Sequence, residues 1–206
     1  MQLKWTRANV SLIAESHNPS ILSPDWIEHH ILGESRENFI HTPIFSHYQS
    51  RSFSLVVEQN RFQLSLRVLS EAALPELQGA ASKYIGTLPQ VPYRAVGLNF
   101  SWTAAAERPE EGFNLMAQLF SSGIERIRKV FSGGTVKIGT ILYHEAAGYR
   151  LQLQVVPQVG TEGNLVLNFN YHFDVHSHDE AREAVSRLVD CFSSADQASR
   201  RLLDLA

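Results

Sequence analysis

The sequence contains a single cysteine, Cys191, among its 206 residues. One thiol cannot form an internal disulfide, and it cannot build a metal site made of cysteines alone. Sparse cysteine usage of this kind suits a reducing compartment, so the sequence predicts a cytoplasmic protein. Because Cys191 falls at the edge of the apolar stripe of a predicted helix, we interpret it as a small buried side chain rather than a nucleophile.

Long apolar segments are missing as well. No stretch approaches the roughly 20 apolar residues that a membrane-spanning helix requires, and residues 1–7 lack the apolar region of a signal peptide. The formal net charge of −3 gives no general attraction to nucleic acids or to anionic membranes. The sequence therefore predicts no membrane association.

The recurrent catalytic signatures are also absent. The chain has no glycine-rich dinucleotide or phosphate loop, no Gly-x-Ser-x-Gly nucleophile motif and no His-Glu-x-x-His zinc motif. These absences favour a protein that binds or assembles over one that catalyses. The sequence predicts no cofactor.

The clearest pattern that is present lies near the carboxyl end. Apolar residues occupy every second position from Leu165 to Val175, which predicts a strand with one apolar and one polar face. Ser177 and Glu180 then form a capping box, which predicts the start of a long helix that continues to about Leu205. Such a helix can cover the apolar face of the strand.

The rest of the chain predicts further elements of the same kinds. Helices are expected at about 24–32, 74–85 and 110–131, and strands at about 7–14, 43–49, 52–58, 61–68, 92–103, 135–144 and 149–157. The order is β-α-β-β-β-α, twice, over residues 5–88 and 91–206. Because each strand has one apolar face, the sequence predicts a single α+β domain over 1–206. Two pseudo-duplicated units would form an antiparallel-rich sheet with helices packed on one face.

A family resemblance is carried by the strand from Val91 to Trp102, with its core Tyr93-Arg94-Ala95-Val96-Gly97-Leu98-Asn99, and by Phe173-Asp174-Val175 before a long helix. In these features the chain resembles a family of sporadically distributed bacterial proteins of unknown function, whose members end in a similar strand and helix. The likeness covers most of the chain, although this sequence is somewhat shorter. It implies the fold and no catalytic residue. By topology alone, the doubled unit is also similar to the saddle of the TATA-binding protein.

The polar face of the predicted sheet is rich in amides and arginines. It collects Arg61, Gln63, Ser65, Arg67, Asn99, Ser101, Arg150, Gln152, Gln154, Asn168, Asn170, His172 and Asp174. Amide and guanidinium groups make directional hydrogen bonds, so this face indicates contact with a protein partner or self-association. The candidate ligand-binding or partner-binding residues are Arg67, Asn99, Arg150, Gln152, Asn168 and Asn170.

Three other interpretations of this protein stay open. The polar face is also compatible with an ordinary solvated surface. Nucleic acid is less favoured as a ligand, because the predicted face carries no aromatic side chain on which bases could stack. A small ligand between the sheet and the helices is a further alternative.

Histidine is the enriched titratable residue, with nine copies in the chain. His172, Asp174 and His176 alternate along the last predicted strand, so they share its polar face. Imidazole and carboxylate groups are good ligands for zinc or iron, and the second hypothesis is therefore a metal-dependent enzyme with its site there. The alternative is that His172 and Asp174 face solvent and that His176 flanks the helix start.

Overall fold

The fold is that of a computed structural model, which describes residues 1–120, 137–146 and 148–204. Nine strands form one antiparallel sheet in the order β2-β3-β4-β5-β1-β6-β9-β8-β7. The strands are β1 (Gln2–Ala14), β2 (Asn38–Thr42), β3 (Phe45–Gln49), β4 (Phe53–Glu58), β5 (Arg61–Leu66), β6 (Tyr93–Ala105), β7 (Thr140–Ala146), β8 (Tyr149–Pro157) and β9 (Leu165–Asp174). The predicted α+β class and antiparallel sheet are confirmed.

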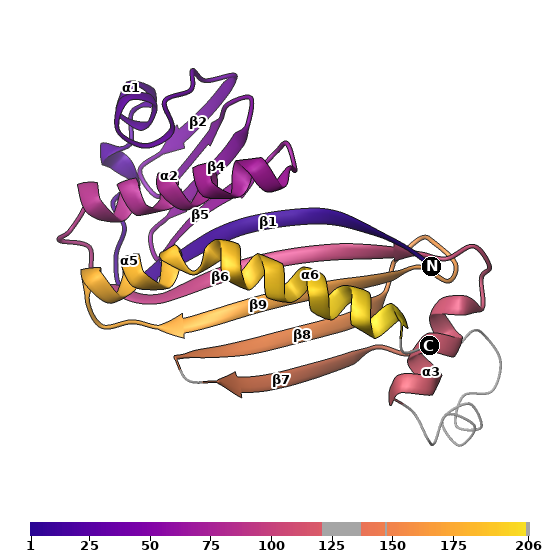
Figure 1. The fold of residues 1–206 in the computed structure, drawn as a ribbon. Helices are drawn as coiled ribbons and strands as arrows, with labels where there is room; N and C mark the ends of the chain where they lie inside the picture. Colours follow the sequence, from indigo (N-terminus) through magenta and orange to yellow (C-terminus); the bar gives the residue numbers. More distant parts are fainter. Residues whose placement is uncertain (121–136, 147, 205–206) are drawn as a thin grey trace.

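Two long strands form the middle of the sheet. β1 and β6 are 13 residues each and pair antiparallel along almost their whole length (Figure 1). Strands β5, β4, β3 and β2 extend the sheet beyond β1, and β9, β8 and β7 extend it beyond β6. Burial alternates along β4, β5 and β9, so each of these strands has one polar face and one apolar face.

One strand was not predicted, so the element order expected for the first half is wrong. β2 stands where the sequence indicated only a polar stretch followed by the next strand. Most of its side chains are exposed, and its strand geometry comes from backbone pairing with β3. Pairing of that kind leaves no periodic trace in the sequence. The first half thus contains five strands.

The described residues also contain five α-helices: α1 (Pro24–Ile27), α2 (Leu74–Thr87), α3 (Glu111–Phe120), α5 (His178–Ser186) and α6 (Leu188–Asp204). A π-helical turn, Glu28–Leu32, continues α1, and short 3-10 turns occupy Pro19–Ile21 and Glu71–Ala73. The part of the predicted helix 110–131 after residue 120 lies outside the described residues. No helix in the described part of the chain is both long and apolar enough to span a membrane.

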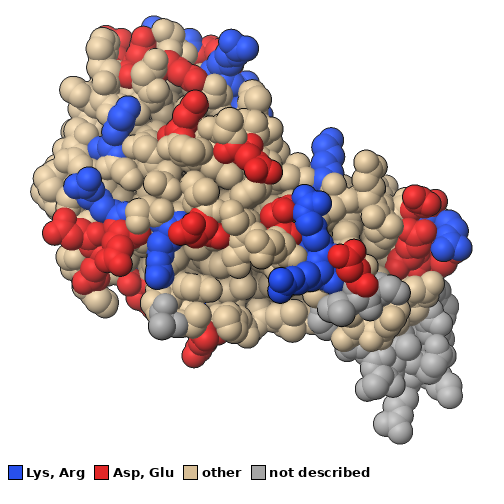
Figure 2. Space-filling model, viewed as in Figure 1, with Lys and Arg blue, Asp and Glu red and all other residues tan. Residues whose placement is uncertain are grey.

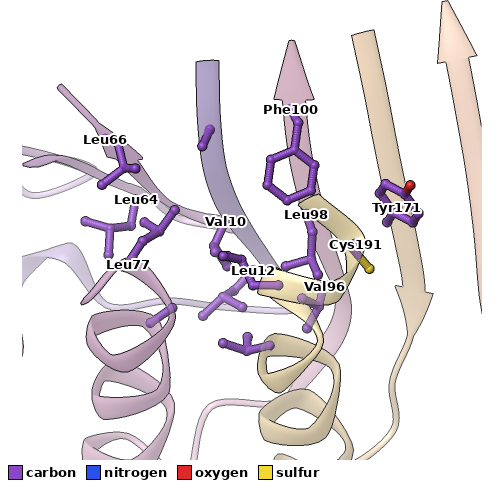
Figure 3. Close-up of a cluster of buried hydrophobic side chains, with 14 of the residues drawn as sticks. Val10, Leu12, Leu64, Leu66, Leu77, Val96, Leu98, Phe100, Tyr171 and Cys191 are labelled. Carbon is purple, nitrogen blue, oxygen red and sulfur yellow. The ribbon is translucent and has the colours of Figure 1, made fainter. Parts of the chain in front are cut away.

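The core lies between the apolar face of the sheet and the helices α2, α5 and α6, which all lie on that face (Figures 1 and 3). Alternate residues of β9 from Leu165 to Phe173 are buried, as the period of two predicted. Leu77 of α2 and Cys191 of α6 join the same cluster from above the sheet. Burial of each large apolar side chain contributes about 1.5–3 kcal/mol.

The helix boundaries follow the predicted capping residues. The hydroxyl of Ser23 accepts from the Trp26 amide at 3.2 Å, and that of Ser177 accepts from the Glu180 amide at 3.1 Å. Gly33, with a φ of 68°, ends the first helical segment. One expectation was wrong, because the last helix breaks at Arg187 into α5 and α6. The break lets α5 pack against α2 while α6 crosses β6 and β9.

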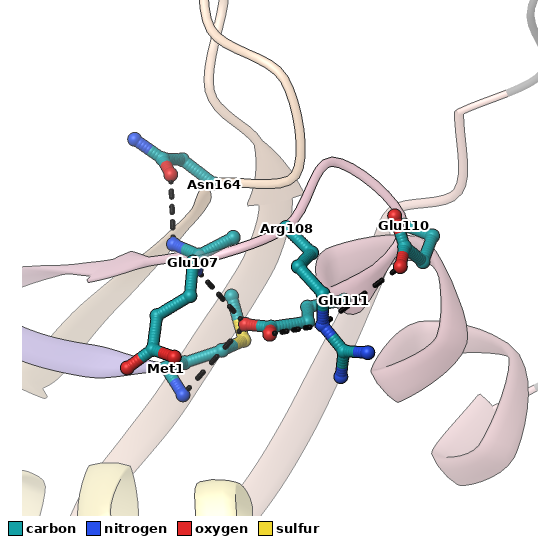
Figure 4. A network of polar contacts seen from close by, with 7 residues as sticks. Met1, Glu107, Arg108, Glu110, Glu111 and Asn164 are labelled. Carbon is teal, nitrogen blue, oxygen red and sulfur yellow. Dashed lines mark hydrogen bonds and ion pairs between the residues drawn. The ribbon is translucent and has the colours of Figure 1, made fainter.

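A polar network fixes the start of α3 (Figure 4). The Glu111 carboxylate accepts a hydrogen bond from the Glu107 amide at 3.1 Å and one from Arg108 Nε at 3.2 Å. The α-amino group of Met1, at the start of β1, lies 3.8 Å from the same carboxylate. The amide of Ala106 donates to Oδ1 of Asn164 at 2.9 Å. These contacts join α3 to the ends of β1, β6 and β9.

Candidate functional site

One row of side chains crosses the polar face of the sheet from edge to edge. The strand register places one residue of each strand in it, and we call this set the amide row: Asn38, Gln49, Ser54, Ser65, Asn9, Asn99, Asn170, Gln152 and Tyr143, in order from β2 to β7. Every member is uncharged and carries a hydrogen-bonding group. With neighbouring strands about 4.8 Å apart, the row is roughly 38 Å long.

Hydrogen bonds run in one direction through the middle of the amide row. Nδ2 of Asn170 donates to Oδ1 of Asn99, and Nδ2 of Asn99 donates to Oδ1 of Asn9 at 2.9 Å. Asn9 is only 5% exposed, so its carbonyl oxygen depends on protein donors. Ser11 Oγ supplies a second, longer one at 3.4 Å. These bonds fix the three asparagines across the central strands.

The chain of hydrogen bonds stops between Asn170 and Gln152. Gln152 turns away and donates from Nε2 to the Tyr143 hydroxyl at 2.9 Å. Within the described residues, neither Oδ1 of Asn170 nor Oε1 of Gln152 accepts a hydrogen bond, and both side chains are partly exposed. This break leaves carbonyl acceptors facing solvent at the centre of the second half of the sheet.

Gly97 leaves a space beside the amide row. It lies between Ser11 and His172 on the polar face. A Cβ placed there would lie 3.5 Å from Nδ2 of Asn99 and 3.6 Å from Nδ2 of Asn170, which is ordinary van der Waals contact. Each amide nitrogen carries two hydrogens, so a carbonyl oxygen above Gly97 could accept from Asn170.

Charged side chains flank the row and pair with each other. Nη2 of Arg150 lies 3.1 and 3.0 Å from the two carboxylate oxygens of Asp174, and Nε2 of His172 lies 3.0 Å from one of them. The hydrogen bond from His172, with help from the nearby Arg150 charge, holds the pKa of Asp174 below its ordinary value. The three predicted residues Arg150, His172 and Asp174 therefore lie together.

His176 does not join this cluster. It follows β9, and its backbone amide donates to the Glu180 carboxylate at 2.7 Å as part of the helix cap. Across the described ranges, no three His, Cys, Asp or Glu side chains form a group that could hold a metal ion. The hypothesis of a metal-dependent enzyme therefore remains a prediction from the sequence. The described residues contain no cluster of metal ligands that supports it.

The other candidate residues divide between the face and a loop. Asn99, Asn170 and Gln152 belong to the amide row, and Asn168 lies one row away, where it accepts from Ser101 Oγ at 2.7 Å. Arg67 follows β5 and contacts the Glu37 carboxylate and the Ser50 carbonyl oxygen. Arg67 therefore binds the segments around Glu37 and Ser50 in the first half of the chain, and it is not part of the amide row.

Sequence reasoning missed several members of the row: Asn9, Asn38, Gln49, Ser54 and Tyr143. Asn9 carried a signal, because it alternates with the apolar residues of β1. Tyr143 also corrects the expectation that the face has no aromatic side chain. It is 73% exposed and lies beside Gln152, since its strand pairs with β8 in that register.

The helix-covered surface of the described residues differs from the amide row in its charge. Figure 2 shows both signs of charge interspersed over it. A small apolar cavity of about 10 Å³ lies between α3, α6, β8 and β9, lined by Leu115, Met116, Leu119, Val155, Leu165, Leu167, Leu202 and Leu203. A cavity of this volume can hold about one water molecule, and it is too small for an organic ligand.

No protein-family model and no curated protein matches the chain. The function is therefore inferred from the amide row and the residues around it.

Proposed function

We propose that this is a non-enzymatic binding protein that holds an extended polypeptide segment of a protein partner against the amide row. The observation that carries the proposal is the row itself, in which nine uncharged hydrogen-bonding side chains stand in register across nine strands. A peptide backbone presents both N–H donors and C=O acceptors. Asparagine and glutamine side chains can satisfy both kinds of group.

The chemistry of the row suits a contact that excludes water. Neutral amides cost less to desolvate than charged groups, and lysine and glutamate are absent from the nine positions. The nearby charges of Arg150 and Asp174 already compensate each other. A partner that covers the row itself therefore desolvates neutral side chains.

The break between Asn170 and Gln152 supports a position for the partner backbone. Their solvent-facing carbonyl oxygens can accept from backbone N–H groups. The space above Gly97 can receive a backbone carbonyl oxygen, which would accept the second hydrogen of the Asn170 amide. Donor and acceptor sites thus lie on adjacent strands, as an extended peptide requires.

The test is a displayed library of short random peptides, selected on the purified protein and remeasured as synthetic peptides by fluorescence polarisation. Gly97→Ala fills the space without a clash, and Gln152→Lys puts a charge into the row. Each is expected to weaken binding by about tenfold or more. Matched controls on the helices, Gly79→Ala and Gln197→Lys, should bind as wild type.

The side-chain amide signals of the asparagines in the row give a second readout. They should shift in NMR spectra when a selected peptide is added. The proposal fails if selection yields no binding peptide, or if the selected peptides bind the two face variants as tightly as they bind wild type.

We also propose that the two halves, 5–88 and 91–206, descend from one duplicated unit. Each half opens with a 13-residue central strand, adds strands outward from it in reverse chain order, and closes with helices over the apolar face. In this interpretation β2 is an addition to the first unit.

A further inference from the structure

The edge strand β7 exposes apolar side chains on both of its faces. Ile141, Leu142 and Tyr143 are consecutive and are 50%, 38% and 73% exposed. β7 ends the sheet, and within the described residues β8 is the one strand that pairs with it. Proteins usually protect such an edge with lysine, proline or a bulge, and the sequence Thr-Ile-Leu-Tyr-His-Glu-Ala has neither lysine nor proline.

We propose that β7 pairs antiparallel with β7 of a second copy of this chain, about a two-fold axis at Leu142. The two sheets would then form one continuous sheet. The backbone groups on the open side of β7 would gain partners, and the exposed apolar side chains would be covered. This inference rests on the edge strand and does not depend on a ligand of the amide row.

The side chains of β7 complement themselves in this register. Leu142 faces Leu142 of the second copy, Ile141 faces its Tyr143, and Thr140 faces its His144. Pairs of an aromatic and a β-branched residue are favourable neighbours across antiparallel strands. Glu145, the one fully charged side chain of β7, faces Gly139 of the second copy, so no like charges meet.

Alternative registers are less favourable. A shift by one residue would set the polar face of one copy beside the helix-covered face of the other, and a two-fold axis does not allow this arrangement. A shift by two centred on Tyr143 would set Ile141 against Glu145 of the second copy. A shift by two in the other direction, centred on Ile141, would set Leu142 against Thr140 and Tyr143 against Gly139. The apolar cluster therefore selects the axis at Leu142.

Size-exclusion chromatography with light scattering tests the assembly. Wild type is expected at twice the 23.1 kDa chain mass. Leu142→Lys places two like charges in contact across the axis and should give the mass of one chain. Val189→Lys on α6 is the matched control, because Val189 is 37% exposed, and it should remain a dimer. A monomeric wild type, or a dimeric Leu142→Lys, overturns the proposal.

Two further measurements report on the register. Mixing Leu142→Lys with Leu142→Glu should restore the dimer, because the opposite charges then face each other. Leu142→Cys should form an intermolecular disulfide under mild oxidation, since directly opposed Cα atoms lie within disulfide range. The native Cys191 is buried and should not react, and Val159→Cys, at a position 95% exposed, is the control. Equal cross-linking at both positions, or failure of the mixture to dimerise, contradicts the register.

Discussion

The hydroxyl oxygen of Tyr84 lies 2.9 Å from Nδ1 of His17, and both side chains are buried. The other ring nitrogen of His17, Nε2, lies 3.2 Å from the carbonyl oxygen of Leu12. Because a carbonyl oxygen only accepts, Nε2 carries the hydrogen, and Nδ1 accepts from the Tyr84 hydroxyl. The neutral imidazole thus ties the chain just after β1 to helix α2.

This arrangement predicts a loss of stability in mild acid. Burial lowers the pKa of His17 from 6.5 to about 4, although its hydrogen bond to Leu12 acts in the opposite direction. The unfolded chain therefore takes up a proton before the folded chain does. As the pH falls from about 6.5 to about 4, the free energy of unfolding should drop by up to about 3 kcal/mol from this residue.

Urea unfolding across that pH range measures the effect. His17→Gln should start from a lower stability at neutral pH, because an amide directs its donor and acceptor at a different angle from the imidazole ring. Its stability should then depend less on pH than that of wild type. If both proteins lose the same amount between neutral and acid pH, other groups cause the change.

Tyr84→Phe isolates the hydroxyl of this pair. The substitution leaves Nδ1 of His17 buried without a donor, which should cost about 1–3 kcal/mol in thermal or urea unfolding. Tyr93→Phe is the matched control. Its hydroxyl donates to the Leu88 carbonyl oxygen at 3.3 Å, and that oxygen also accepts from the Val91 amide at 3.2 Å. The control should therefore cost less, and the reverse order would contradict the assigned hydrogen bonds.

The sequence predicted the strands whose side chains alternate between core and solvent. Residues of β4, β5 and β9 alternate in burial over their whole length, so periodicity and structure agree. β2 escaped prediction because backbone pairing at the sheet edge defines it. The break at Arg187 escaped prediction because α5 and α6 both keep an apolar stripe, so the sequence pattern alone does not separate them.

The amide row was predictable in part. Alternation assigns Asn99, Asn170 and Gln152 to the polar face, but it does not give the register between strands. Asn9 and Asn99 are 90 residues apart in the chain and still share a hydrogen bond. That contact exists because β1 and β6 pair in one particular alignment, which tertiary packing selects. The position of Arg67 outside the row was likewise not predictable from alternation, because its partner Glu37 comes from a loop before β2.

Glu111→Gln should loosen the start of α3. The carboxylate accepts from the Glu107 amide, and this hydrogen bond together with Arg108 and the Met1 amino group holds the pKa of Glu111 below its ordinary value. A neutral amide weakens all three contacts, so hydrogen exchange should become faster at the Glu107 amide and in the first turn of α3. Glu110→Gln is the control, because Glu110 contacts Arg108 only at 3.8 Å. Equal exchange rates in both variants would show that Glu111 does not anchor the helix.

Asn99→Asp tests the direction of hydrogen bonding in the amide row. Asn99 donates to Oδ1 of Asn9, and an aspartate at neutral pH would instead set a carboxylate oxygen against that acceptor. Asn9 is buried, so water cannot replace the lost donor to its Oδ1. The free energy of unfolding should therefore fall by about 1–3 kcal/mol. Part of the loss should be recovered in acid, where the protonated carboxyl can donate again.

Asn168→Asp supplies the matched control for that prediction. Oδ1 of Asn168 accepts from Ser101 Oγ, and a carboxylate retains this acceptor role. In the described residues Nδ2 of Asn168 has no hydrogen-bond partner, so its loss removes no contact. The same substitution should therefore be nearly neutral at Asn168 and costly at Asn99. Equal effects at the two positions would mean that added charge, and not the donor role of Asn99, sets the stability of the row.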